Sequence, residues 1–417
     1  MELDETGAVR VAGAELEYRM TGPPPGDAPT VILLHEGLGC VALWKDFPDR
    51  LAAVTGLGVF AYSRRGYGRS SPYEVPWPLT YMHQEGEQVL PALLDAIGFR
   101  DGILFGHSDG ASIAAIYAGA TGGSRLRGLV LMAPHFFTED VGIASIAEAK
   151  AAYETADLRD RLAVHHGDNV DCAFWGWSRA WLDPDFRQWD IQDYLPQIKM
   201  PVLIVQGEDD QYGTAGQIAV AQNKCAGRVS VALLPDCGHS PYRDQAEKTL
   251  DAAAAFISCL LVALPAGDYP FPAQPHVPGS GSEPDMAPLQ RVKRTCPPRV
   301  DADDWRNNVA YRYGWSLFDA GFFWEAHEIW EPVWHVCAPN SRERLLLRAL
   351  IQIANGRLKK TMEKDKASAR LFAEADRLLA EVAGPESTTS VPLMGVDIGG
   401  LRRSLLTFRT NPIYKDA

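Results

Sequence analysis

Long hydrophobic runs are scarce in this sequence. The longest apolar stretch, AAAAFISCLLVALPAG near 252–267, is short for a bilayer span and is interpreted as the last helix of a first domain. The opening segment, MELDETGAVRVAG, is acidic and lacks the basic and apolar regions of a secretion signal. These absences predict a cytoplasmic protein that has no membrane partner.

Paired cysteines and concentrated positive charge are missing as well. The seven cysteines are scattered and form no CxxC pair, which argues against a disulfide framework and favours buried thiols. The net charge of −13 argues against a nucleic-acid partner, because binding to phosphates requires a basic face. A short basic run at 291–294 lies in a proline-rich stretch and is interpreted as part of a solvated linker.

The overall composition is that of a globular protein with more than one domain. Apolar residues make up 46% and charged residues 22% of the 417 residues, and this length is too great for one compact core. Proline, glycine and serine dominate the segment 264–300, and no apolar period of 2 or 3.6 residues runs through it. We therefore predict domains at 1–263 and 301–417, joined by a linker over 264–300.

The first domain alternates short apolar segments with stretches of helix length. The apolar segments are rich in branched residues and bounded by glycine, proline or polar residues, as the buried strands of a parallel sheet are. This alternation predicts a doubly wound α/β sheet, opened by an antiparallel hairpin. The hairpin is expected over 9–11 and 15–20, and the strands over 30–34, 58–62, 102–105, 128–132, 202–205 and 229–234.

Residues from about 137 to 198 interrupt this alternation. The segment has helical patterning and carries Trp175, Trp177, Trp181 and Trp189. We predict a helical cap over the carboxyl edge of the sheet, where a large apolar insertion can enclose an apolar substrate. The alternative interpretation is that these tryptophans are only the core of the cap.

The second domain shows helical periodicity and no convincing strand. Apolar residues recur at i, i+3 and i+4, which predicts a small all-helical bundle. The expected helices cover 305–319, 323–337, 341–360 and 367–382, with a looser last helix around 398–407.

The segment 106–110, GHSDG, fits the pattern G-x-S-x-G. It follows the predicted strand GILF and precedes the helix-like segment GASIAAIYAG, and this strand–turn–helix context is the one in which such a serine acts as a nucleophile. Small residues two positions before and after Ser108 leave room for a sharp turn. The following helix directs its free N–H groups towards the surroundings of the serine. We therefore predict that Ser108 is the nucleophile.

An acid and a histidine follow Ser108 in the order that this chemistry requires. The loop QGEDD comes after the predicted strand VLIV, and DCGHS comes after VALLP. We predict His239 as the general base and Asp210 as the acid that holds its other ring nitrogen, with Asp209 and Glu208 as alternatives to Asp210.

Two backbone N–H groups are expected to bind the developing oxyanion. One belongs to Asp109, directly after the nucleophile, and the other to the loop HEGLG at 35–39, where we favour Gly37 over Glu36. The side chain of Glu36 is unusual where glycine is commoner, and we expect it to orient the loop or to touch substrate. The expected substrate pocket comprises Glu36, Leu38, His135, Trp175, Trp177 and Trp181, with a structural role as the alternative for His135.

The chain from Leu34 to His239 resembles the α/β-hydrolase superfamily. The resemblance rests on LLHEGLG, SRRGYGRSSP, GHSDG, QGEDD and GHSPYRD, which occur in this order. The sequence departs from the common pattern in HEGLG, where an HGG-type loop is usual, and in the aspartate after the nucleophile. The resemblance implies an α/β-hydrolase fold with a catalytic triad and an oxyanion hole.

A second resemblance covers most of the second domain. LFDAGFFWEAHEIWEPVW followed by LLLRALIQIANGRLKK resembles a helical family known as domain of unknown function 309, which implies a fold and no activity. His327, Glu328 and Glu331 share one helix face, and HExxE is similar to the zinc motif HExxH. We favour a buried polar network with Gln352 or Asn355 for these residues, with a metal or ligand site as the alternative.

The predicted residues are those of an enzyme that transfers an acyl group to water. Ser108 is expected to attack a carboxyl ester, lactone or thioester, after which His239 activates water for deacylation. The tryptophan-rich cap favours a small, moderately apolar substrate, and we expect no cofactor. Hydrolysis of a C–C or amide bond is the alternative on the same triad, and a non-catalytic sensor or scaffold is the alternative from another class. A homo-oligomer formed through the helical domain is a further option.

Overall fold

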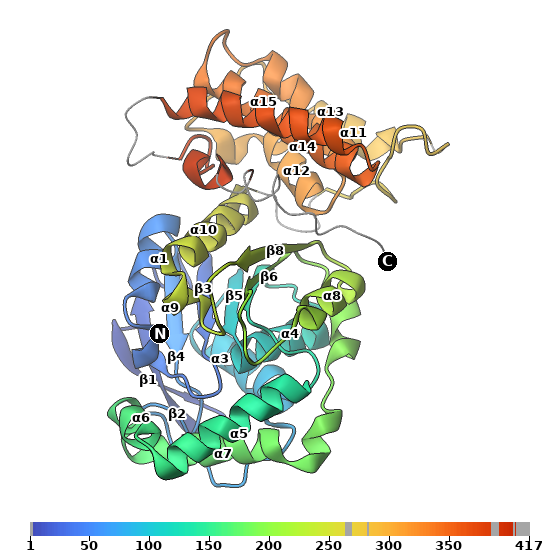
Figure 1. The fold of residues 1–417 in the computed structure, drawn as a ribbon. Helices are drawn as coiled ribbons and strands as arrows, with labels where there is room; N and C mark the ends of the chain where they lie inside the picture. The colour runs from blue at the N-terminus through green and yellow to red at the C-terminus, as the bar shows by residue number, and fades with distance from the viewer. Residues whose placement is uncertain (1–2, 263–268, 282, 385–391, 403–404, 406–417) are drawn as a thin grey trace. The chain divides into compact units, whose positions relative to one another are not determined.

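The chain forms two compact units, residues 1–253 and 254–417. A computed structural model describes residues 3–262, 269–281, 283–384, 392–402 and 405 (Figure 1). The sequence pattern placed the end of the first domain at residue 263, whereas the division in the structure falls inside helix α10 (Ala246–Val262).

The first unit is built on one eight-stranded sheet. The strand order is β1-β2-β4-β3-β5-β6-β7-β8, in which β1 and β2 run antiparallel to their neighbours and the other pairs are parallel. The strands are β1 (Thr6–Val11), β2 (Ala14–Thr21), β3 (Thr30–Leu34), β4 (Gly58–Tyr62), β5 (Gly102–His107), β6 (Leu126–Met132), β7 (Val202–Gly207) and β8 (Val229–Leu234).

The burial of the strands explains their sequences. The central strands β3, β4 and β5 are buried along their whole length, because helices cover both faces of a parallel sheet and leave no polar side. Strand β2, which lies between the edge strand β1 and β4, instead alternates buried with more exposed residues, as its sequence AELEYRMT does. The predicted α/β fold is confirmed. Strands β5 and β7 each run two residues beyond the predicted apolar segment, up to the loops that carry the candidate site.

Helix α4 (Asp109–Thr121) is the central helix of this unit. It packs against β3, β5 and β6, and its residues from Asp109 to Gly119 are all buried. A helix enclosed on every side needs no polar face, which fits the small and apolar sequence GASIAAIYAG. The other helices outside the cap are α1 (Phe47–Thr55), α2 (Tyr81–Gln84), the π-helix η2 (Glu85–Val89), α3 (Leu90–Ala96), α8 (Ala215–Lys224), α9 (Pro241–Asp244) and α10, with a short 3-10 turn η1 (Val41–Trp44).

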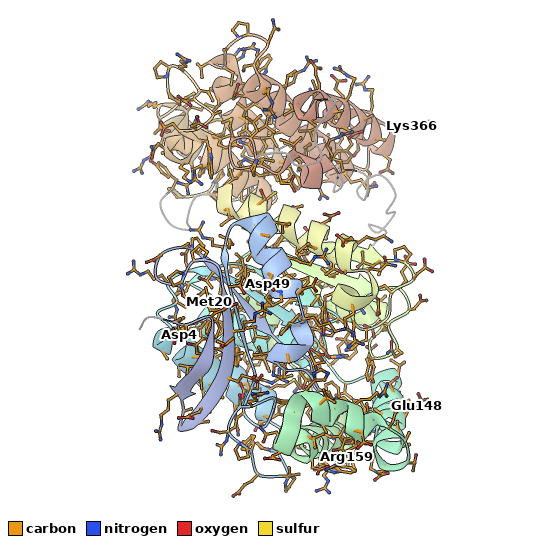
Figure 2. All side chains as sticks on the ribbon, turned by 90° about the vertical axis from the view of Figure 1, so that its left-hand side faces the viewer. Asp4, Met20, Asp49, Glu148, Arg159 and Lys366 are labelled. Carbon is orange, nitrogen blue, oxygen red and sulfur yellow. The ribbon has the colours of Figure 1, made fainter. Side chains whose placement is uncertain are left out.

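The insertion between β6 and β7 is a helical cap, as predicted. Figure 1 shows its three main helices lying together at one end of the unit. Arg159, which Figure 2 labels, donates a hydrogen bond to Asp171 at 2.6 Å. Tyr153 stacks on Phe174 with 3.6 Å between ring centres. These contacts tie together the helices α5 (Asp140–Thr155), α6 (Leu158–His166) and α7 (Val170–Leu182), which short 3-10 turns η3 (Gly167–Asn169), η4 (Pro184–Gln188) and η5 (Gln192–Gln197) complete.

The second unit is all-helical in its described part, which confirms the predicted bundle. Its core is aromatic, and Trp315, Trp330 and Tyr311 are among its fully buried side chains. None of the helices in the described part of the chain combines the length and hydrophobicity that crossing a bilayer requires. The helices are α11 (Met286–Lys293), α12 (Val309–Asp319), α13 (Phe323–His335), α14 (Arg342–Thr361) and α15 (Asp365–Ala383), with a 3-10 turn η6 (Trp305–Asn307) before α12.

The segment 264–300 contains a helix that the sequence pattern missed. In α11, Leu289 and Val292 are spaced i, i+3 and both are buried in the helical core. The expectation that no helical period runs through this segment is therefore wrong, and the basic residue Lys293 belongs to a packed helix. Of the last helix predicted over 398–407, residues 398–402 are helical, and most of the remainder lies outside the described residues.

Candidate active site

The candidate nucleophile lies on a sharp turn between β5 and α4. Ser108 has φ 53° and ψ −119°, a positive-φ conformation that residues with a side chain rarely adopt. Glycines make the turn possible, because a Cβ at Gly106 would lie 2.4 Å from the carbonyl oxygen of Gly110, and one at Gly110 would lie 2.1 Å from that of Leu34. Ser108 is thereby held at the carboxyl end of β5, in the context expected for G-x-S-x-G.

Three of the predicted side chains meet in one chain of hydrogen bonds. Ser108 Oγ lies 2.9 Å from Nε2 of His239, and Nδ1 of His239 lies 2.9 and 3.0 Å from the two carboxylate oxygens of Asp210. The two alternative acids, Asp209 and Glu208, are exposed. The structure therefore brings Asp210, and neither alternative, to the histidine.

The environment of Asp210 favours its ionised form. Its Oδ1 accepts from the backbone N–H of Tyr212 at 2.8 Å, and its Oδ2 accepts from Nε2 of Gln206 at 2.6 Å. Burial alone would raise the pKa of Asp210, but the hydrogen bond and charge of His239 and the N–H of Tyr212 outweigh it and hold the pKa below its usual range. An ionised Asp210 fixes the ring of His239 with its proton on Nδ1, so that Nε2 faces the serine as an acceptor.

The two expected oxyanion donors lie on neighbouring segments. Leu34 and Gly106 are paired residues of the adjacent strands β3 and β5, so the loop 35–39 and the serine turn leave the same edge of the sheet. Asp109 is the first residue of α4, and no carbonyl of that helix can accept its N–H. The cap packs closely against Gly37, since a Cβ at this position would lie 2.2 Å from Nε1 of Trp177.

Arg64 holds the carbonyl side of the same loop. Its guanidinium is 1% exposed and donates to the carbonyl oxygens of both His35 and Glu36. The backbone N–H of Arg64 donates to Nε2 of His35 at 3.0 Å, and Nδ1 of that ring donates to the carbonyl oxygen of Glu36 at 2.7 Å. With its carbonyls held in this way, the loop has a fixed backbone. No local pattern indicates this role, although Arg64 lies in the segment SRRGYGRSSP on which the family resemblance partly rests.

The aspartate after the nucleophile connects the serine turn to the cap. Tyr81 Oη donates to Asp109 Oδ2 at 2.5 Å, and Trp181 Nε1 lies 3.3 Å from Oδ1 of the same carboxylate. Burial raises the pKa of Asp109, against the opposing effects of the Arg64 charge and the two donors. This unusual aspartate is therefore an acceptor for side chains of α2 and α7, and it fixes the residue that carries an expected oxyanion donor.

The tryptophans of α7 have different surroundings. Trp177 lies over Gly37, and the ring of Trp181 lies 5.3 Å from that of His135. Trp175 instead packs within the cap, edge-on to Tyr153 at 5.5 Å. The structure thus brings Trp177 and Trp181 to the residues around the triad, and it does not place Trp175 there.

The remaining expected pocket residues frame the histidine and the loop. The ring of His135 lies 5.5 Å from that of His239, and burial together with the charge of His239 lowers the pKa of His135 to about 3. Tyr212, which the sequence did not single out, lies 4.6 Å from His239 on a ring-to-ring measure. Leu38 is partly buried, and its carbonyl oxygen accepts from Nε2 of His166 at 3.1 Å. His135 and Tyr212 therefore enclose the candidate base with neutral rings.

The metal candidates of the helical unit also come together. One ligand atom from each of His327, Glu328 and Glu331 lies within 4.8 Å of the others. Glu328 Oε2 is also paired with Nζ of Lys293 at 2.8 Å, which supplies a positive charge where a cation would bind. Among the described residues, no hydrogen bond joins the three side chains to Gln352 or Asn355, the partners that we expected from the sequence.

Comparison with known families agrees with this fold. Residues 31–253, just over half of the chain, match the alpha/beta hydrolase family, so the chain belongs to that family. Residues 311–371 match a domain of unknown function, DUF309. A hydrolase is the class of enzyme that the first unit defines.

Individual relatives are distant. The chain is 32% identical to epoxide hydrolase B of Mycobacterium tuberculosis over 108 residues, which span 25% of this chain and 29% of that protein. It is 28% identical to serine hydrolase BPHL of Homo sapiens over 211 residues, 48% of this chain and 69% of that one. An esterase structure from Exiguobacterium antarcticum has a TM-score of 0.50 and 19% identity, covering 60% of this chain and 98% of its own, which is a likeness of fold alone.

Proposed function

We propose that the chain is a serine hydrolase that cleaves a carboxyl ester, lactone or thioester through an acyl-enzyme on Ser108. The observation that carries the proposal is the continuous hydrogen-bonded chain from Ser108 Oγ through His239 to Asp210, with 2.9 Å at each link. A ligand-binding protein has no need of a base directed at a hydroxyl on a strained turn.

The first half of the reaction forms the acyl-enzyme. His239 Nε2 takes the proton of Ser108 as Oγ attacks the carbonyl carbon, and Asp210 stabilises the imidazolium that results. The oxyanion of the tetrahedral intermediate accepts hydrogen bonds from the N–H groups of Asp109 and Gly37. The intermediate collapses when His239 gives its proton to the departing alcohol or thiol.

The second half releases the acid. His239 takes a proton from water, the hydroxide attacks the acyl carbon, and the same two N–H groups hold the second oxyanion. Collapse of this intermediate frees the carboxylic acid and returns the proton to Ser108. The site needs no group beyond these residues and water.

The nature of the nucleophile favours acyl substrates over epoxides. Attack by a serine oxygen on an epoxide carbon would form an ether, which water and a histidine base do not cleave, whereas an acyl-serine is an ester and turns over. We therefore do not extend the activity in the name of the Mycobacterium tuberculosis relative to this chain. The rings of Trp177 and Trp181 near the site favour a small, moderately apolar acyl group.

The test is covalent labelling followed by a substrate panel. A fluorophosphonate probe is expected to label the wild-type chain and the control variant Ser124→Ala, in which an exposed serine between α4 and β6 is changed. It is expected to leave Ser108→Ala unlabelled. Ester, lactone, thioester and amide substrates of increasing acyl length then define the bond that is cleaved. A wild-type chain that neither reacts with the probe nor turns over any ester would favour the non-catalytic alternative.

A further inference from the structure

Glu36 and His107 form a polar pair beside the proposed triad. Glu36 Oε2 lies 3.3 Å from Nδ1 of His107, and their side chains are 17% and 0% exposed. The carboxylate belongs to the loop after β3, and the imidazole belongs to the residue before Ser108. This contact does not have the geometry of a hydrogen bond, and among the described residues Nδ1 of His107 has no hydrogen-bond partner.

The other ring nitrogen of His107 reaches the loop of the candidate base. Its Nε2 lies 2.6 Å from the backbone carbonyl oxygen of His239. Because a carbonyl oxygen can only accept, Nε2 carries a proton there. The ring of His107 therefore bridges the loop of Glu36 and the loop of His239.

The contact with His107 favours the ionised form of Glu36. Burial alone would raise the pKa of this carboxyl, but its interaction with the neighbouring imidazole outweighs burial and lowers the pKa of Glu36 to about 2. Glu36 is therefore a carboxylate whose Oε2 faces the ring of His107.

Gly39 and Tyr242 lie directly beside this pair. A Cβ at Gly39 would lie 2.4 Å from Glu36 Oε2, so the glycine is what admits the carboxylate at this place. The ring of Tyr242 packs edge-on against that of His107, with 5.5 Å between the ring centres. The side chain of Glu36 is thereby directed at His107.

We propose that Glu36 and His107 are positioning residues that lock the oxyanion loop to the loop of the catalytic histidine. The pair sets the distance between the N–H donor of Gly37 and the base His239, both of which act on the substrate held at Ser108. The inference rests on the proposed function. Its specific content is that the charge of Glu36 acts on the chemical step through His107 and does not touch the substrate.

The backbone of the loop is held by other contacts, which makes the proposal testable. The carbonyl oxygen of Glu36 accepts from His35 at 2.7 Å and from Arg64 at 3.1 Å, whatever its side chain is. Removal of the charge in Glu36→Gln is therefore expected to leave the loop folded. The small displacement that remains affects the alignment of donor and base, on which the rate depends steeply.

Steady-state kinetics of the full chain on a p-nitrophenyl ester test the proposal. Glu36→Gln is expected to lower kcat about 10- to 100-fold with KM within about twofold. His107→Gln, which keeps an N–H donor but loses the ring that bridges the two loops, is expected to lower kcat by a similar factor. The double variant should lose little more than either single variant, because the two residues act as one unit. The control is Asp49→Asn, which removes the carboxylate of a surface pair with Arg19 (Figure 2), and it is expected to keep wild-type kcat.

Three results would overturn the inference. A kcat for Glu36→Gln within twofold of wild type removes the positioning role, and a change confined to KM across an acyl-length series assigns Glu36 to substrate contact instead. Where His107→Gln fails to fold, nuclear magnetic resonance of isotope-labelled histidine in the wild-type chain and in Glu36→Gln decides. We expect the loss of the carboxylate to shift the ring-nitrogen resonances of His107, and a spectrum without that shift would contradict the contact. If the wild type itself lacks probe labelling and esterase activity, the proposed function fails, and the resonance result still stands or falls on its own.

Discussion

Two glycines, one in each unit, meet a tryptophan in the same way. A Cβ at Gly37 would lie 2.2 Å from Nε1 of Trp177, and a Cβ at Gly314 would lie 2.2 Å from Nε1 of Trp330. In the helical unit the indole of Trp330 donates to the carbonyl oxygen of Tyr311 at 3.0 Å, and the contact serves only to pack two helices together. In the α/β unit the glycine belongs to the loop that carries a proposed oxyanion donor. Close packing of a glycine against a tryptophan therefore does not by itself indicate a functional site. What distinguishes Gly37 is the polar groups of its loop and of the neighbouring serine turn.

The buried polar residues of the two units differ in the same respect. In the α/β unit Arg64 and Asp109 hold the segments on either side of the serine turn, and Asp210 and His239 lead to Ser108 Oγ. In the helical unit Glu325 is 1% exposed and accepts from the backbone N–H of His276 at 2.7 Å. The hydrogen bonds of the α/β unit therefore lead to a serine hydroxyl, which can react. The hydrogen bond of Glu325 leads only to a backbone amide, which cannot.

The largest contrast is expected between Asp210, the proposed acid of the triad, and the metal candidates of the helical unit. Asp210→Asn keeps the shape of the side chain but favours the wrong tautomer of His239, so kcat on an ester substrate should fall about 10⁴-fold. The exposed neighbour in Asp209→Asn is the matched control and should stay within about twofold, as should His327→Ala. A strong loss of activity in His327→Ala would break the comparison, because the helical unit would then take part in the chemistry.

The next largest effect concerns the glycine of the α/β unit. In Gly37→Ala the new methyl group meets the indole of Trp177 and displaces the loop from the serine turn, so kcat/KM should fall about 10- to 100-fold. Combining it with Trp177→Phe, which shortens the ring system that the methyl group meets, should recover part of the loss. If Gly37→Ala retains full activity, the added methyl group does not clash with Trp177, and the N–H of residue 37 is not an oxyanion donor.

The matching change in the helical unit should affect stability and spare activity. Gly314→Ala places a methyl group against the buried ring of Trp330, and overpacking of this kind costs about 1–3 kcal/mol. Hydrogen exchange of the full chain, followed by mass spectrometry, should show faster exchange in α12 and α13 with esterase kinetics unchanged. Unaltered exchange in these helices would mean that the core relaxes around the added methyl group.

The smallest effect is a pH dependence of stability at Glu85. This half-buried residue lines a cavity of about 210 Å³ with Arg64 and Tyr81, and burial raises its pKa from 4.5 to about 7. The folded chain therefore binds a proton that the unfolded chain has lost, and the stability from this proton is complete below pH 4.5 and disappears as the pH rises through about 7. Glu85→Gln should match the wild type at pH 4.5 and exceed its melting temperature by about 2–4 °C at pH 8. Equal melting temperatures at pH 8 would show that the carboxyl is not destabilised when ionised.

Local sequence signals were enough for the strands and for the order of the site residues. The runs TVILL and GVFAY are bounded by polar residues or glycine and appear unchanged as β3 and β4. Ser108, Asp210 and His239 each follow a strand, and parallel strands end at the same edge of a sheet, so their meeting could be expected from order alone.

Contacts between distant segments could not be predicted in this way. The pair of Glu36 with His107, and the acceptance by Asp109 of donors from Tyr81 and Trp181, depend on how loops and cap pack, and no local pattern encodes that packing. Two misses did carry a signal. Trp177 and Trp181 are four residues apart on a helix and share a face, and Trp175 does not lie on that face. In the segment 286–293, two apolar residues have the spacing of a helix.

The bond between Ser108 and His239 also has a consequence for refolding. It joins residues 131 positions apart, from the ends of β5 and β8, and it forms only when the strands between them in the sheet are in register. Such long loops close slowly, whereas neighbouring helices such as α14 and α15 make contacts that are local in the chain. After dilution from denaturant, the return of the proposed esterase activity should therefore report the completion of the parallel sheet, and it should lag behind the return of helical circular dichroism.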